Sequence, residues 1–262
     1  MPILADTHVH IYPFYDLSHF FRSAFEKMAA QDNGPDTDYV LFLAERHDCH
    51  FFRQLKEGLC KVSGAECDPG EEVLSIRNAG GKRLWLAAGR QVVTAERLEI
   101  LALTTDAEIA DGQPVREVIR KIREAGAVPV IAWAPGKWFF ARGKVVRELI
   151  DSEPAGSFLL GDTTLRPTVW LEPLLMRHAR KKGFKVVAGS DPLPVPGEET
   201  KAVSYGNRCD GRIDPAHPLK SLREMLTSLP GAKTFGGRDS LLNVLIRLKK
   251  NSAAKSDRKS VV

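Results

Sequence analysis

The segment Asp6-Thr7-His8-Val9-His10, near the start of the chain, carries residue types suited to metal chemistry. Side chains alternate along a strand, so Asp6, His8 and His10 would share one face of a strand over residues 3–11. The other face would carry Ile3, Ala5, Thr7 and Val9. Two imidazoles one strand-pitch apart can bind one metal ion, and an aligned carboxylate can bind the ion or orient the rings. We predict a metal site here; two unrelated histidines at a strand end are the alternative.

A second polar group follows an apolar stretch late in the chain, Val187-Ala188-Gly189-Ser190-Asp191-Pro192. Asp191 would lie at the carboxyl end of a late strand, and in a closed barrel such a strand neighbours the first one. Asp191 could then face His8 and His10 and complete a site for one divalent ion of zinc, manganese or iron. The alternative is an aspartate that begins a turn before proline.

Glu45 and His47 follow a predicted buried strand over residues 39–44. They would share one strand face, where they could act as general acid and base or bind a metal. A capping cluster ahead of a helix that begins at Phe51 explains them equally well.

Basic and polar side chains follow other predicted strands and could hold a phosphate or carboxylate. The candidates for this substrate-binding role are Lys137, Arg142, Arg166, Lys201 and Tyr205. Each residue alone would be an ordinary surface group. The hypothesis is that all of them converge at the mouth of one barrel.

Short apolar runs alternate with amphipathic stretches, a pattern that predicts parallel βαβ units. We expect helices over residues 17–30, 51–59, 114–125, 144–150, 171–182, 219–226 and 241–248. Residues 71–105 instead contain successive strand-like pieces with a Gly80-Gly81 turn, which predicts an antiparallel excursion. Residues 192–212 are rich in proline and glycine, so we expect a long loop there. Six or seven units in one chain favour a barrel.

The composition is that of an ordinary globular protein, with 43% hydrophobic and 27% charged residues in a chain of 262. We expect one domain over residues 1–250 and a disordered basic tail over 251–262. The cysteines form no CxxC pair, which favours free thiols. No leader segment and no apolar run of membrane-spanning length is visible, so we expect a cytoplasmic protein without a membrane partner. The net charge of +5 suits a small anionic substrate, and no nucleic-acid-binding motif is present.

The order of these motifs resembles that of the polymerase and histidinol phosphatase (PHP) superfamily, from Ile3 to about Pro196. Asp6 to His10 looks like the family's D-x-H-x-H motif, and Glu45-Arg46-His47 like its Asp/Glu-His motif. Gly89-Arg90-Gln91-Val92 is similar to the Gly-x-Glu-x motif, and Gly189-Ser190-Asp191 to the closing motif. The resemblance implies a distorted seven-stranded (β/α) barrel, a site for up to three metal ions, and hydrolysis of phosphate esters.

The chain departs from the family pattern at four positions. Gln91, Glu99, Trp133 and Leu193 stand at or near places where the family has metal-binding residues. The remaining donors predict one ion at most. We therefore expect a metal-dependent hydrolase of phosphate esters or similar anions, or a catalytically inactive barrel that binds an anionic ligand. An amidohydrolase-type enzyme is a third alternative, although no histidine lies between His50 and His178.

Overall fold

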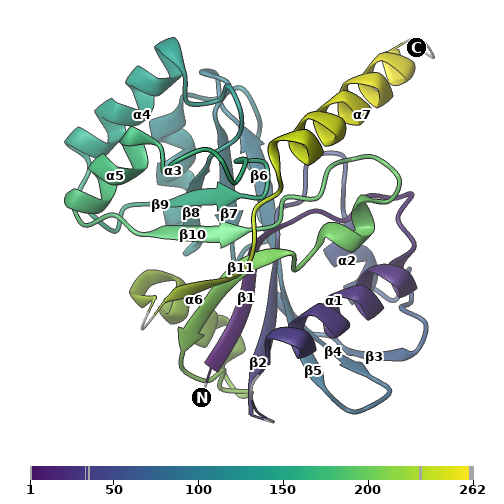
Figure 1. Ribbon diagram of the computed structural model, residues 1–262. Helices are drawn as coiled ribbons and strands as arrows, with labels where there is room; N and C mark the ends of the chain where they lie inside the picture. The colour runs from purple at the N-terminus through teal and green to yellow at the C-terminus, as the bar shows by residue number, and fades with distance from the viewer. Residues whose placement is uncertain (1, 33, 35, 230–231, 260–262) are drawn as a thin grey trace.

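The computed structural model describes residues 2–32, 34, 36–229 and 232–259 and contains two mixed β-sheets with helices packed against them (Figure 1). The first sheet has seven strands in the order β12-β11-β1-β2-β5-β4-β3. Its strands are β1 Pro2–Val9, β2 Asp38–Leu43, β3 Ala65–Asp68, β4 Val73–Asn78, β5 Arg83–Ala87, β11 Tyr205–Asp210 and β12 Lys233–Gly236. The second sheet has five strands in the order β10-β9-β8-β7-β6. Its strands are β6 Gly89–Val93, β7 Glu99–Leu103, β8 Val128–Ala132, β9 Leu159–Thr163 and β10 Val186–Gly189.

The expectation of one seven-stranded barrel is wrong, because the two sheets do not close into a single barrel. The reason is β11, which lies inside the segment expected to be a loop and pairs antiparallel with β1 from Pro2 to Ala5. This pairing occupies the edge of β1 that β10 would need. The side chain of Asn207 on β11 bonds to β10 instead: its Nδ2 donates to the Ala188 oxygen at 2.8 Å, and the Ala188 nitrogen donates to its Oδ1 at 2.9 Å.

The two sheets approach each other at two seams. At one seam the Glu45 nitrogen donates to the Gly89 oxygen at 2.9 Å, and the Gln91 nitrogen donates to the Glu45 oxygen at 2.8 Å. A Cβ atom at Gly89 would lie 2.0 Å from the Leu43 oxygen, so this approach requires glycine. At the other seam the Asp191 nitrogen donates to the His8 oxygen at 2.9 Å. Both seams lie at the carboxyl ends of strands.

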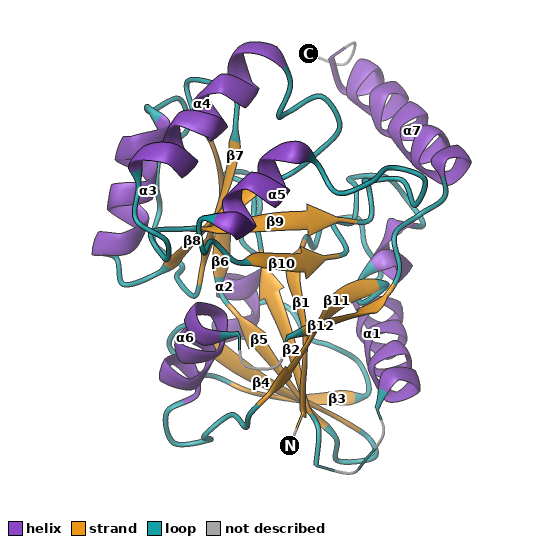
Figure 2. Ribbon diagram, turned by 60° about the vertical axis from the view of Figure 1, so that its left-hand side comes forward, coloured by secondary structure: helices purple, strands orange, loops and turns teal. Residues whose placement is uncertain are grey.

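The helices pack on the two sheets (Figure 2). Helix α1 (Leu17–Gln31) covers the seven-stranded sheet, and α6 (Pro218–Ser228) closes a core that contains residues from both sheets. Helices α3 (Val115–Glu124), α4 (Phe140–Ser152) and α5 (Leu174–Lys181) cover the five-stranded sheet. On α3 the buried residues are Val115, Val118, Ile119 and Ile122, the spacing expected for one helix face.

The remaining elements are the short helix α2 (Phe51–Lys56), the 3-10 helix η1 (Glu198–Lys201) and the long helix α7 (Leu241–Lys259). Helix α7 projects away from the body of the molecule (Figure 1). The tail expected over residues 251–262 begins inside this helix, and residues 260–262 lie outside the described residues. In the described part of the chain, no helix has the length and apolar character needed to cross a membrane.

Candidate metal centre

Three donor side chains from distant parts of the chain come together at the second seam. His8 and His10 approach through their Nε2 atoms, which lie 3.0 Å apart. Each Nε2 lies 3.6 Å from Oδ1 of Asp191, and all three residues are buried. Two nitrogens bound to one tetrahedral zinc at about 2.0–2.1 Å would lie roughly 3.3 Å apart. The donor types and their spacing therefore fit one divalent ion.

An irregularity in β1 sets the directions of these side chains. Asp6 is opposite Leu41 of β2 and Val9 is opposite Leu43, so β1 has one more residue than β2 between these pairs. Such a bulge interrupts the alternation of side chains. As a result Val9 packs in the same core cluster as Leu4. The expectation that Val9 shares a face with Ile3 and Ala5 is therefore wrong.

Asp6 is completely buried and its carboxylate is used by the protein itself. Its Oδ1 accepts hydrogen bonds from the His8 nitrogen at 3.2 Å and the Ser190 nitrogen at 2.9 Å. Its Oδ2 accepts from the Val203 nitrogen at 2.8 Å and from the Ser190 hydroxyl. Burial raises the pKa of Asp6 to about 6, and these donors oppose the shift. Asp6 was expected as a possible metal ligand. In the structure its carboxylate connects β1 to the chain after β10 through these hydrogen bonds.

Gly189 allows β10 to lie against the histidine strand. A Cβ atom on Gly189 would lie 2.4 Å from Cβ of His8 and 2.6 Å from its backbone nitrogen, closer than real side chains come. Two residues later, Asp191 has a left-handed backbone with φ of 52°, which is uncommon outside glycine. The strand end is thus shaped to bring the Asp191 carboxylate to the two imidazoles.

The charge states of His8 and Asp191 suit a cation. Burial lowers the pKa of His8, so its ring is neutral and keeps a lone pair for a metal. Burial alone would raise the pKa of Asp191, but His8, His10 and Arg247 bring it down to about 2. Nδ1 of His8 is also buried, with no hydrogen-bond partner among the described residues. The protein therefore presents a neutral His8 imidazole and an ionised Asp191 carboxylate at one point.

A cavity of about 730 Å³ is lined in part by Gln91. Gln91 also lies next to His8, which places the cavity beside the centre. Glu45 and Arg90 line it too, and both are almost fully buried. Oε1 of Glu45 accepts from the Phe52 nitrogen at 3.0 Å, and its Oε2 lies 3.7 Å from Nη1 of Arg90. Burial raises the pKa of Glu45 to about 7, against the Phe52 amide and Arg90.

His47, the second residue predicted to act in catalysis, lies on the rim of this cavity. Its side chain is 72% exposed, and its Nδ1 lies 3.6 Å from Oδ2 of Asp111. Glu45 and His47 therefore share a cavity, but Glu45 lies in the buried wall and His47 at the solvent edge. Their catalytic roles stay predictions.

Each of the five side chains predicted to bind an anionic substrate has a partner within the protein. Arg166 forms a bidentate ion pair with Asp162, at 2.7 and 2.6 Å, and Tyr205 donates to the same carboxylate at 3.1 Å. Lys201 lies 2.9 Å from Asp239. The two other contacts are Arg142 to the Gly136 oxygen and Lys137 to Glu99.

Among these five residues, Lys137 pairs with a carboxylate, that of Glu99, which itself interacts with His8. Glu99, which holds its ammonium group at 2.9 Å, lies close enough to His8 to raise the pKa of that ring. The substrate-binding roles of the five stay predictions.

Two of the family positions that lack metal-binding residues are filled by core packing. Trp133 is 2% exposed and packs with the helices on the five-stranded sheet. Leu193 packs with Leu165 and Val195. Neither side chain can bind a metal, which leaves the three donors described above.

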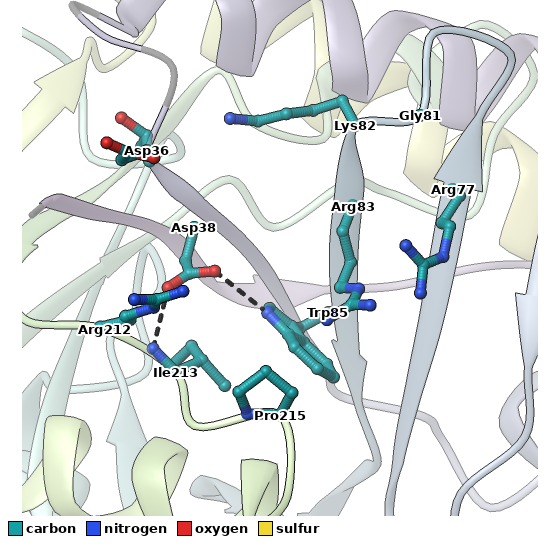
Figure 3. Close-up of a pocket in the computed structure, with 11 residues that line it drawn as sticks. Asp36, Asp38, Arg77, Gly81, Lys82, Arg83, Trp85, Arg212, Ile213 and Pro215 are labelled. Carbon is teal, nitrogen blue, oxygen red and sulfur yellow. Dashed lines mark hydrogen bonds between the residues drawn. The ribbon is translucent and has the colours of Figure 1, made fainter.

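Another cavity, of about 230 Å³, lies at the opposite end of the seven-stranded sheet (Figure 3). It is lined by Asp38 and Arg83, where the parallel strands β2 and β5 begin, whereas the candidate centre lies where strands end. Asp38 accepts hydrogen bonds from Trp85 Nε1 at 3.3 Å and from the Ile213 nitrogen at 2.8 Å. These hydrogen bonds connect Asp38 to β5 and to the chain after β11, so its carboxylate has a structural role.

Sequence reasoning missed two residues that surround the centre. Arg247, on α7, lies 56 residues beyond Asp191 and donates to its backbone oxygen at 2.9 Å. Tyr12 stacks on the ring of His10, with centroids 5.6 Å apart. The alternation of His8, His10 and Tyr12 was a usable signal for the tyrosine, whereas nothing local marks Arg247.

The fold and the three donors together define an α/β protein with a candidate centre for one metal ion. No family model matches the chain, and no curated protein matches it in sequence. The fold is similar to the crystal structure of PsfC from Pseudomonas syringae PB-5123, with a TM-score of 0.56 and 13% identity over 97% of this chain and 98% of PsfC. This similarity shows a shared fold.

A second solved structure is that of the novel lesion-specific endonuclease PfuEndoQ from Pyrococcus furiosus. It aligns with 89% of this chain at 14% identity and a TM-score of 0.49. The alignment covers 58% of PfuEndoQ, so the chain spans little more than half of that protein.

Proposed function

We propose that this protein is a metal-dependent hydrolase of the PHP type that acts on a phosphate ester or a similar anionic substrate with one divalent ion. The observation that carries the proposal is the convergence of His8, His10 and Asp191. Catalytic zinc sites have three protein ligands and one open position, which is the number of donors here. The metal would be zinc, manganese or iron.

A divalent ion at these ligands would supply Lewis acidity toward a phosphoryl oxygen and toward water. Neutral imidazoles and a single carboxylate leave such a site with net positive charge, which favours an anionic substrate. Glu45 supports the proposal as a proton acceptor, because a carboxyl group with a pKa of about 7 can exchange protons near neutral pH. The cavity lined by Glu45, Arg90 and Gln91 is the proposed place of the organic part of the substrate.

Lys137 is the cation that we propose to bind the anionic group, since Glu99 holds it near His8. Its side chain is 27% exposed, so it can reach solvent and a ligand. Arg166 and Tyr205 support the proposal less, because the buried carboxylate of Asp162 engages both.

A second candidate function is an inactive relative that binds an anionic ligand. The packing of Trp133 and Leu193 favours it, because these residues exclude a multinuclear centre at the positions used by the family. The two candidates differ in their need for metal.

Metal content and activity test the proposal together. The protein would be purified without a metal-binding tag, loaded with zinc, manganese or iron(II), and measured by elemental mass spectrometry beside a His8→Ala/His10→Ala variant. We expect about one ion per wild-type chain, none in the variant, and hydrolysis of p-nitrophenyl phosphate or its diester only by the loaded wild type. Absence of metal after loading would refute the proposed centre and support the binding protein, whereas stoichiometric metal without hydrolysis of a broad phosphoester panel would refute the proposed hydrolase activity.

A further inference from the structure

Arg247 is a buried arginine on a helix that is otherwise largely exposed. It is 4% exposed, and all three nitrogens of its guanidinium group donate hydrogen bonds. Nε and Nη2 contact the carboxylate of Glu198 at 2.8 and 2.6 Å, and Nη1 contacts Thr164 Oγ1 at 2.7 Å and Asp239 Oδ2 at 2.8 Å. Nη2 also donates to the backbone oxygen of Asp191 at 2.9 Å.

These contacts hold the turn that carries the Asp191 carboxylate. The backbone of Asp191 is left-handed, a conformation that aspartate tolerates better than most residues, and hydrogen bonds on both sides hold it. The Arg247 guanidinium holds the backbone oxygen of Asp191, and the His8 oxygen holds its backbone nitrogen.

Glu198 extends the same anchorage to the far side of the turn. Its Oε2 accepts from the Leu193 nitrogen at 3.0 Å while it also accepts from Arg247. Thr164, which also accepts a hydrogen bond from Arg247, donates its hydroxyl to the Ser190 oxygen. The backbone on both sides of Asp191 is thus tied to groups that Arg247 binds.

Helix α7 reaches the centre through very few residues. From 241 to 254, where side-chain burial is described, Val244 and Arg247 are the buried positions. Four apolar neighbours are instead 45–66% exposed, namely Leu241, Leu242, Leu245 and Ile246. A helix with so little buried surface gains little stability from packing, yet it delivers one fully bonded guanidinium to the metal-site turn.

We propose that Arg247 is a positioning residue for the metal centre, which fixes the backbone of Asp191 so that its carboxylate meets His8 and His10. The inference rests on the proposed function, because it concerns the affinity of the same three ligands. Residues that orient metal ligands typically change metal affinity 10–100-fold when they are replaced. Arg247 therefore acts on the ion through the Asp191 backbone.

The test is zinc affinity of the metal-free full chain, measured by competition with a chromophoric chelator at a temperature where every variant is folded by circular dichroism. We expect Arg247→Met to weaken zinc binding about 10–100-fold. Arg247→Lys keeps the charge but cannot contact Glu198, Thr164 and Asp191 together, so we expect a smaller loss of at least about threefold. Lys250→Ala, at an exposed position of the same helix, is the matched control and should bind zinc like the wild type.

Wild-type affinity in folded Arg247→Lys and Arg247→Met would overturn the positioning role while leaving the metal centre intact. If Arg247→Met does not fold, Arg247→Lys decides, and its unchanged affinity overturns the proposal by itself. A lowered unfolding midpoint with unchanged zinc affinity would show a purely structural role. Absence of zinc, manganese and iron(II) binding in the wild type would overturn the proposed function and this inference together.

Discussion

Replacing Asp6 with asparagine tests whether this carboxylate positions the backbone or binds an ion. Asp6 accepts four hydrogen bonds, from the backbone of His8, Ser190 and Val203 and from the Ser190 hydroxyl. The amide group of asparagine has one oxygen and one NH₂ group, so one pair of donors loses its acceptor. The less costly orientation places NH₂ toward Val203 and Ser190 Oγ, because the hydroxyl can turn and accept.

The cost can be estimated from that orientation. The Val203 nitrogen then has no acceptor, and an unsatisfied buried donor costs about 1–3 kcal/mol. We expect Asp6→Asn to lower the free energy of unfolding by about 2 kcal/mol, which corresponds to roughly 4–8 °C in the midpoint for a chain of this size. Asp6→Ala removes all four acceptor contacts and should cost more, about 4 kcal/mol.

The assay is chemical and thermal unfolding in the presence of EDTA. A positioning role predicts the full loss in metal-free protein. Asp191→Asn is the comparison, because the carboxylate of Asp191 faces the two imidazoles. It should weaken zinc binding, and because the interactions that lower the Asp191 pKa to about 2 are lost, it should also destabilise the metal-free protein by about 2 kcal/mol. The reasoning is refuted if Asp6→Asn unfolds like the wild type in EDTA and differs only when zinc is present.

Three further predictions follow from other contacts. Gly189→Ala should destabilise the protein by about 2 kcal/mol or more, since its Cβ would meet His8 at 2.4 Å, whereas Gly237→Ala, with nothing within 4 Å, should be nearly neutral in urea unfolding. The pKa of Glu45, raised to about 7, predicts a contribution to stability that is fully present below about pH 4.5 and is lost, by about 3 kcal/mol, as pH rises through 7. Glu45→Gln should flatten this part of the pH profile, and an unchanged slope would contradict it. Leu242→Glu, at an exposed position of α7, should change the unfolding free energy by no more than about 0.5 kcal/mol; a larger loss by calorimetry would mean that the side chain is packed.

Sequence patterns correctly predicted the helices and hairpins whose signals lie within a short stretch of the chain. The periodic apolar residues of α3 and the hairpin at Gly80-Gly81 are present where the sequence places them. The meeting of His8 and His10 with Asp191 was also predictable, because strand ends in alternating β/α chains gather at one edge. Whether the three residues bind metal stays a prediction.

The barrel prediction failed because of a strand with no strand-like pattern. β11 reads Tyr-Gly-Asn-Arg-Cys-Asp, without the alternation of apolar and polar residues that marks most strands. Its role depends on Asn207, whose side chain occupies the position of a backbone between β1 and β10. Likewise the bulge in β1 separates Asp6 from His8 and His10, and depends on pairing with β2 that composition does not reveal. Arg247 could not be found because three of its partners, Glu198, Thr164 and Asp191, lie 49, 83 and 56 residues away in the sequence.

The three candidate ligands belong to different sheets. His8 lies on β1, the third strand in the order of the seven-stranded sheet, and His10 directly follows β1, whereas Asp191 follows the edge strand of the five-stranded sheet. An ion bound to all three would add a further link where the Asp191–His8 backbone bond and the hydrogen bonds from Ser190 to Asp6 already join the strand ends. Opening of this seam would then require dissociation of the ion, so amide hydrogen exchange along β10 and the end of β1 should slow in proportion to metal occupancy. The same seam would set the rate at which the loaded protein loses its metal to a chelator.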